Sequence, residues 1–166
     1  MAQAKTAQIL AHWDTLLNVQ IAPLAFYDLV ERDISSQGFP ELKVTRVLWR
    51  EGGLFSAQRE YLRVKRKTLV FDICAAPLGN NFFVAWWLGE TTPGVADLFM
   101  EIPLIGTVLK TLFRPATYYK VDTTTAFQHT VHNAVLAVVD NLTEKNGLEP
   151  LSSDERIPIL ENFYNW

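Results

Sequence analysis

The sequence contains very little cysteine, because Cys74 is the only one among 166 residues. A single cysteine excludes a disulfide within the chain and a zinc site built from cysteine thiolates. This usage fits a reducing compartment, and the first residues lack the basic and then uniformly apolar order of a secretory signal. We therefore predict a cytoplasmic protein in which Cys74 is a small core residue of a strand.

Glycine is also scarce, with eight scattered residues. The chain has no glycine-rich phosphate loop, no dinucleotide fingerprint and no Gly-x-Ser-x-Gly nucleophile turn, all of which depend on glycine. The sequence therefore predicts no cofactor. The net charge of −3 further excludes a molecule that is basic overall, as many nucleic-acid-binding domains are.

Length and composition indicate one globular domain over residues 1–166. Apolar residues make up 49% of the chain and charged residues 20%, which is ordinary globular usage. Within this domain, residues 1–40 are predicted to be helical, since apolar residues recur there at steps of three and four, with a second helix starting near Pro23. These apolar residues are Leu10, Trp13, Leu17, Ile21 and Leu24.

Residues 41–90 change to the alternating pattern of strands and predict an antiparallel β-meander. Leu62 and Val64 share one face of a strand, and the next strand has the same inward face through Leu69, Phe71 and Ile73. The run 82–88 is apolar on both faces, which is typical of an inner strand that is covered on both sides.

The rest of the chain is predicted to be mostly helical. Residues 94–114 read as a broken apolar helix, 116–121 as a possible short strand, 123–146 as a long amphipathic helix, and 147–166 as a tail. The predicted fold class is therefore α+β. A central antiparallel meander of four to five strands is packed by N-terminal helices and by the long helix.

Positive charge is concentrated in residues 43–67, where eight Lys and Arg face two Glu, so the window carries +6 and the rest of the chain −9. On a meander these side chains are expected to gather on one face and at one hairpin tip. Such a surface suits an anionic partner, namely a lipid headgroup, an acidic protein or nucleic acid. The candidate binding residues are Arg46, Arg50, Arg59, Arg63, Lys65, Arg66 and Lys67. A non-enzymatic binding module is the first functional hypothesis.

Two alternatives belong to other functional classes. The apolar segment 94–114 is too short to span a bilayer between its charges, but it could contact a membrane surface peripherally or bury itself against a second copy. The third hypothesis is a metal-dependent enzyme that uses His129 and His132, expected on the polar side of the long helix, with the carboxylates of Asp97 and Glu101. No fixed metal-ligand motif supports it.

Overall fold

The computed structural model describes residues 6–50, 58–91 and 117–160, and the structural statements below concern these residues. It is an α+β fold, as predicted, with an antiparallel sheet of six strands rather than four to five. The elements are β1 (Thr6–Leu17), α1 (Pro23–Ser36), β2 (Lys43–Arg50), β3 (Gln58–Arg66), β4 (Leu69–Leu78), β5 (Asn81–Thr91), α4 (Tyr118–Lys145), a short 3-10 helix (Asp154–Arg156) and β6 (Ile159–Leu160).

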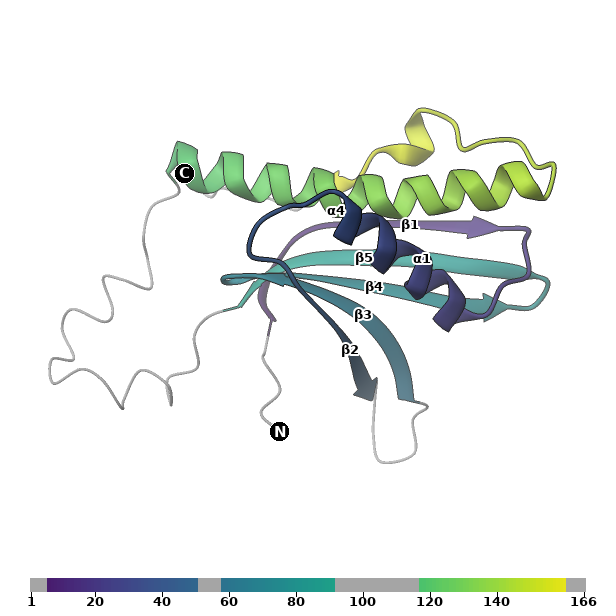
Figure 1. The fold of residues 1–166 in the computed structure, drawn as a ribbon, viewed down its shortest axis with the longest axis horizontal. Coiled ribbons are helices and arrows are strands. Elements are labelled where there is room, and N and C mark those ends of the chain that lie inside the picture. The colour runs from purple at the N-terminus through teal and green to yellow at the C-terminus, as the bar shows by residue number, and fades with distance from the viewer. Residues whose placement is uncertain (1–5, 51–57, 92–116, 161–166) are drawn as a thin grey trace, which may run out of the picture.

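The strand order is β2-β3-β4-β5-β1-β6, so four consecutive strands form the predicted meander and β1 adds beside its last strand (Figure 1). The strand β5 is an inner strand, paired with β4 on one side and β1 on the other, as predicted. Two tight turns separate the later strands. Lys67, with φ 53°, and Thr68 form the first turn, and Gly79, with φ 61°, lies in the second.

The prediction of a helix at the N-terminus was wrong for the first part of the segment, which is the twelve-residue strand β1. Ala11, Trp13 and Leu17 face the core at even spacing, as a strand requires, but the small Ala11 and the polar Thr15 hide this period. A register shift between Ile9 and Ala11 adds Leu10 to the buried set. The remaining apolar residues then imitate a helical spacing.

The prediction of a helix beginning near Pro23 is confirmed by α1. Proline stands in its first turn, where a missing N–H costs nothing, and the helix ends before Gly38, which has φ 62°. It buries Phe26, Tyr27 and Val30 against the sheet.

The long helix α4 begins at Tyr118, so the predicted short strand over 116–121 was wrong. The reason is local, because the side chain of Thr117 accepts a hydrogen bond from the N–H of Lys120 at 3.2 Å. This cap extends the helix one turn and more before the predicted start. Its end is close to the prediction, since α4 runs to Lys145 and Gly147 follows with φ 64°.

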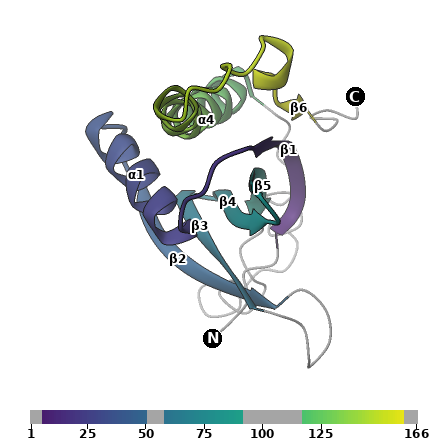
Figure 2. The same ribbon diagram turned by 90° about the vertical axis from the view of Figure 1, so that its right-hand side faces the viewer.

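Both long helices lie on the same side of a strongly curved sheet (Figure 2). The core fills the space between the helices and the sheet and includes the inward faces predicted for β3 and β4. The ring of Phe71 is tilted by 36° against Trp86, with 4.4 Å between centroids, and is edge-on to Phe127 at 6.1 Å. In α4 the buried face also matches the prediction, with Phe127, Val131, Ala134, Val135, Val138 and Leu142.

The segment 94–114 lies outside the described residues, and so do Asp97 and Glu101. Within the described ranges, neither long helix has a stretch long and apolar enough to cross a membrane.

Candidate functional site

The predicted basic residues do not share one face of the sheet, and that expectation was wrong. Side chains of a strand alternate between two faces, so register decides where each one lies. Arg46 is opposite the core residue Leu62, and Arg66 is opposite the core residue Leu69, which places both arginines on the helix side. The opposite face carries Arg59, Arg63 and Lys65, while Lys67 is in the turn and Arg50 ends β2.

Two of these arginines join elements of the fold. Arg46 donates hydrogen bonds to Asp28 at 2.8 Å and to Glu31 at 3.1 Å, so it ties β2 to α1. Arg63 makes two hydrogen bonds to Asp72, each 2.7 Å long, across β3 and β4. The Arg63–Asp72 pair is bidentate, which holds both side chains in one geometry. Arg46 donates to both of its carboxylates from Nη2, and its Nη1 is buried without an acceptor among the described residues. Neither arginine is presented to a partner.

Arg66 and Lys67 lie together at the β3–β4 turn. A cavity of about 130 Å³ lies between this turn and the first part of α4. We call it the basic pocket. Its lining residues are Arg66, Lys67, Thr68 and Leu69 from the turn region and Tyr119, Lys120, Thr123 and Thr124 from the helix.

Arg66 is the buried member of the basic pocket, with a relative exposure of only 8%. Its guanidinium carbon lies over the ring of Phe39, 5.4 Å from the ring centroid. Its Nε–H is buried and has no hydrogen-bond acceptor among the described residues. A buried donor without an acceptor costs about 1–3 kcal/mol, and more when the group is charged. Nε has almost no exposed surface, so this donor does not itself face the cavity.

Among the described residues, Arg66 forms its salt bridge with Glu41. The Oε2 of Glu41 lies 3.5 Å from Arg66 Nη2 and also 3.5 Å from Lys67 Nζ. Charge-assisted N–H···O bonds are normally about 2.7–2.9 Å long, so both contacts are loose. Glu41, with φ 63°, and Lys67, with φ 53°, both have left-handed backbone, which costs about 1–2 kcal/mol for residues other than glycine.

The helix side of the basic pocket carries a second cation. Lys120 Nζ lies 2.8 Å from Glu90 Oε2, and the hydroxyl of Thr68 donates to the other oxygen of Glu90 at 3.1 Å. Lys120 is in the first turn of α4, where the helix dipole is positive. Three cations therefore face two carboxylates at the positive end of a long helix, which leaves an excess of positive charge.

His132 was predicted on the polar side of the long helix, and that was wrong, because it is buried in the core. Its Nδ1 accepts a hydrogen bond from Trp86 Nε1 at 3.1 Å, so its Nε2 carries the proton and donates to the carbonyl of Arg156 at 2.8 Å. Burial lowers the pKa of His132, and the hydrogen bond to the Arg156 carbonyl opposes this shift in pKa. His132 is a neutral structural residue.

The C-terminal segment 151–160, which includes Arg156, makes further polar contacts to β1 and α4. Trp13 Nε1 donates to the carbonyl of Glu155 at 2.6 Å, and Arg156 makes two hydrogen bonds to Asp140 at 2.6 Å and 3.0 Å. We call these contacts of residues 151–160 the tail clasp. His129 is exposed on α4 and takes no part in the tail clasp. No three His, Cys, Asp or Glu side chains cluster into a metal site within the described ranges.

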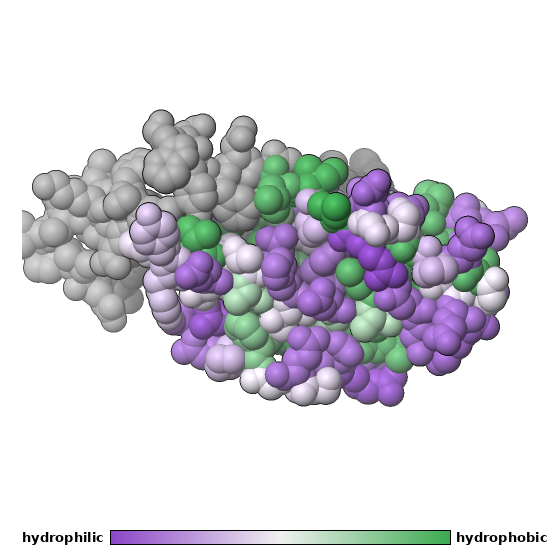
Figure 3. All heavy atoms as spheres, turned by 90° about the horizontal axis from the view of Figure 1, so that it is seen from above, coloured by the Kyte–Doolittle hydropathy of each residue, from purple (hydrophilic) through white to green (hydrophobic). Residues whose placement is uncertain are grey.

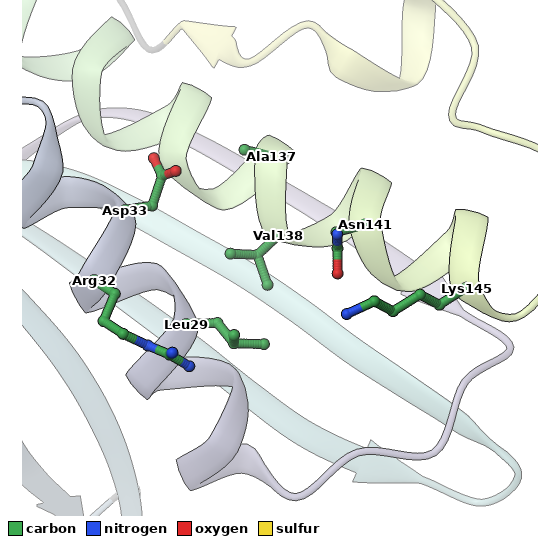
Figure 4. Close-up of a pocket in the computed structure, with 7 residues that line it drawn as sticks. All are labelled: Leu29, Arg32, Asp33, Ala137, Val138, Asn141 and Lys145. Atoms are coloured by element: carbon green, nitrogen blue, oxygen red, sulfur yellow. The ribbon is translucent and has the colours of Figure 1, made fainter.

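A larger groove of about 450 Å³ runs between α1 and α4 (Figure 4). Figure 4 shows the amine of Lys145 extended toward α1, across a floor that includes Leu29 and Val138. Its polar side chains are exposed and interact within the chain: Arg32 donates to the carbonyl of Asp28, and Asp33 accepts from Gln37. The groove offers no buried donor that needs a ligand.

A third cavity, of about 280 Å³, adjoins the point where β3 parts from β4. There the hydroxyl of Tyr27 accepts from the N–H of Ala75 at 2.9 Å and donates to the carbonyl of Glu60 at 2.7 Å. Burial raises the pKa of Tyr27 to about 12. The protonated hydroxyl thus replaces a missing backbone hydrogen bond between two diverging strands, and its role is structural.

Sequence reasoning identified Arg66 and Lys67 but missed Glu41, Glu90 and Lys120. Lys120 fell in the segment misread as a strand, although a threonine three residues before it is a helix-cap signal. Comparison of the chain with protein-family models, with curated proteins and with solved structures found no match.

Proposed function

We propose that this protein is a non-enzymatic binding module that contacts an anionic partner through the basic pocket. The observation that carries the proposal is that Arg66, Lys67 and Lys120, from the β3–β4 turn region and the start of α4, line one cavity. Cations gathered around one cavity repel one another, and an anion bound among them relieves this repulsion.

The charges around Arg66 support an anion rather than a neutral acceptor. Lys67 and Lys120 approach the basic pocket from two different elements, and the start of α4 adds a positive partial charge. A lipid headgroup, an acidic protein and nucleic acid all offer anionic groups of this kind. The proposal therefore narrows the sequence hypothesis from a whole basic face to one end of the β3–β4 hairpin.

The experiment measures binding of a labelled heparin oligosaccharide, a soluble polyanion, by the full chain over a range of salt concentrations. Lys67→Gln is expected to weaken binding about threefold or more, and added salt should weaken it further. Lys65→Gln is the matched control, because Lys65 is exposed on the opposite face of the sheet. Equal effects of the two substitutions, or binding that does not respond to salt, would contradict the proposal.

A second candidate function is self-assembly at the other edge of the sheet. The two-residue strand β6 pairs only with Ala11 and His12, so most of the outer edge of β1 has no partner strand among the described residues. Ile157, Ile159 and Leu160 are exposed beside this edge. An unpaired edge with exposed apolar side chains is a typical place for strand addition.

The view from above, onto α4, shows a largely hydrophilic face in which hydrophobic side chains gather in separate clusters (Figure 3). Self-assembly predicts that the full chain sediments as an oligomer and that Ile159→Lys shifts it toward the monomer. A monomer at every concentration tested would remove this candidate. Peripheral membrane contact through 94–114 stays a prediction, since that segment lies outside the described residues.

A further inference from the structure

We propose that the basic pocket binds a phosphate monoester group among the three cationic side chains that line it, those of Arg66, Lys67 and Lys120. This inference rests on the proposed function and names the chemistry of its ligand. Four properties of the basic pocket lead to it: its size, the arrangement of its donors, its charge, and the carboxylate of Glu41 beside the donors.

The size of the basic pocket suits one compact anion. At about 130 Å³ it is the smallest of the three cavities described above. A phosphate group, with one phosphorus and four oxygens, is a compact anion. A nucleobase, a sugar chain or a peptide segment would have to remain outside the pocket, and only its charged end could enter.

The donors of the basic pocket come from different directions, as a tetrahedral anion requires. Arg66 lines the cavity from the end of β3, while Lys67 and Lys120 approach from the turn and from the helix. Arginine suits phosphate because its fixed fork can donate two parallel hydrogen bonds, whereas lysine contributes a point charge. The Thr123 hydroxyl of α4 also lines the cavity.

The charge of the site favours a group with more than one negative charge. At neutral pH a phosphate monoester carries about −1.5 to −2 charges. The three cations of the basic pocket are matched only in part by Glu41 and Glu90, and the start of α4 attracts anions as well. A monoester balances this site better than a phosphodiester, which has a single charge.

The carboxylate of Glu41 lies beside Arg66 and Lys67, where it would compete with a phosphate group for these two cations. Its carboxylate is loosely held, at 3.5 Å from both Arg66 Nη2 and Lys67 Nζ, and its side chain is exposed. A phosphate oxygen could approach these cations more closely, and Glu41 could move into solvent. Glu41 therefore acts as an internal competitor that the ligand displaces, so its removal should tighten binding.

The test measures binding of phenyl phosphate, a soluble phosphate monoester, to the full chain by titration calorimetry. Arg66→Lys should weaken binding about tenfold, because it keeps the charge but loses the guanidinium fork. Glu41→Gln should tighten binding about threefold or more, because it removes the competing charge. Glu149→Gln is the control, since Glu149 is exposed in the loop after α4 and should have no effect.

A thermal melt of each variant checks that it folds. If Arg66→Lys fails to fold, Lys120→Gln takes its place, because Lys120 is half exposed and should weaken binding about threefold. The inference is overturned if phenyl phosphate binds with unchanged affinity both to Glu41→Gln and to the folded cation variant, which is Arg66→Lys or its replacement Lys120→Gln. That result would place the ligand elsewhere.

The proposed function and this inference can fail separately. If heparin binds and Lys67→Gln weakens it, but phenyl phosphate neither binds nor competes, the inference is wrong and the proposed function stands. If neither probe binds, both are wrong. Vesicles that contain phosphatidic acid, which has a monoester headgroup, separate the two sources of the ligand. Binding to them supports a lipid headgroup, and binding of phenyl phosphate alone supports a soluble phosphorylated molecule.

Discussion

Arg156 packs beside the second half of α4 and Arg66 beside its start, and the two arginines differ in how many of their donors have acceptors. Arg156, in the tail clasp, donates from all three guanidinium nitrogens, to Leu151 O at 3.0 Å and to both oxygens of Asp140. Arg66, in the basic pocket, is more deeply buried, yet its Nε has no acceptor among the described residues and its one carboxylate lies 3.5 Å away.

The difference separates a structural polar group from a candidate binding group. In the tail clasp every donor meets an acceptor, so the contacts stabilise the fold and leave nothing for a ligand. In the basic pocket a charged donor is buried at a cost that the described residues do not offset. Residue type and local charge alone do not distinguish these two arginines.

The largest expected effect comes from breaking the tail clasp at its centre. His132→Phe keeps an aromatic ring between Trp13 and Trp86 but leaves Trp86 Nε1 and the Arg156 carbonyl without their partner. We expect the free energy of unfolding to fall by about 2–4 kcal/mol, measured by urea denaturation. His129→Phe on the exposed side of α4 is the control and should change it by less than about 0.5 kcal/mol.

Replacing Arg156 should have a smaller effect of the same sign. Arg156→Met removes the bidentate pair with Asp140 and the hydrogen bond to Leu151, although the pair is partly exposed to solvent. We expect a loss of about 1–2 kcal/mol in the free energy of unfolding. If Arg156→Met leaves the free energy of unfolding unchanged or raises it, the contacts of Arg156 do not stabilise the fold. The contrast drawn with Arg66 would then be wrong.

Acid should weaken the tail clasp through His132. Its pKa is lowered in the folded protein, first because of burial, so the unfolded chain binds the proton more readily. Stability is therefore greatest above the unfolded pKa of about 6.5 and falls as the pH decreases from there toward the folded pKa. Urea denaturation between about pH 7.5 and pH 5.5 should show this fall, and His132→Phe should lose part of it.

Arg66→Met should have the smallest effect on stability, which would indicate that Arg66, unlike Arg156, is not needed to hold the fold together. The substitution removes an unsatisfied buried donor, and exposed Glu41 remains solvated, so the free energy of unfolding should change by less than about 0.5 kcal/mol or rise. Phenyl phosphate binding should be lost in the same variant. A loss of stability as large as that of Arg156→Met would show that Arg66 is a structural residue and would end the comparison.

Local signals predicted much of the architecture. Alternation in β3 and β4, the apolar run in β5, and the breakers Pro23 and Gly147 placed the meander, α1 and the end of α4 close to their observed bounds. The failure at β1 has a physical cause, since Ala11 and Thr15 occupy core-side positions without a large apolar side chain. Burial of a small residue leaves little trace in a hydrophobic pattern.

The candidate site was predictable only in part. The charge density of 43–67 directed attention to Arg66 and Lys67, but the same pattern included Arg46 and Arg63, which pair with carboxylates in other elements. A sequence cannot show which cations find a partner in space. Nor does it predict that Glu41 has a left-handed backbone that holds its carboxylate near the turn.

By itself the sequence determined the α+β class, the meander and the amphipathic face of α4, because these follow from periodicity and turn residues near one another in the chain. Only the tertiary structure decided that His132 is a core residue and that Arg66, Lys67 and Lys120 share one cavity. These outcomes depend on strand register and on how α4 crosses the sheet. Both are set by packing between residues far apart in sequence, where local patterns carry no information.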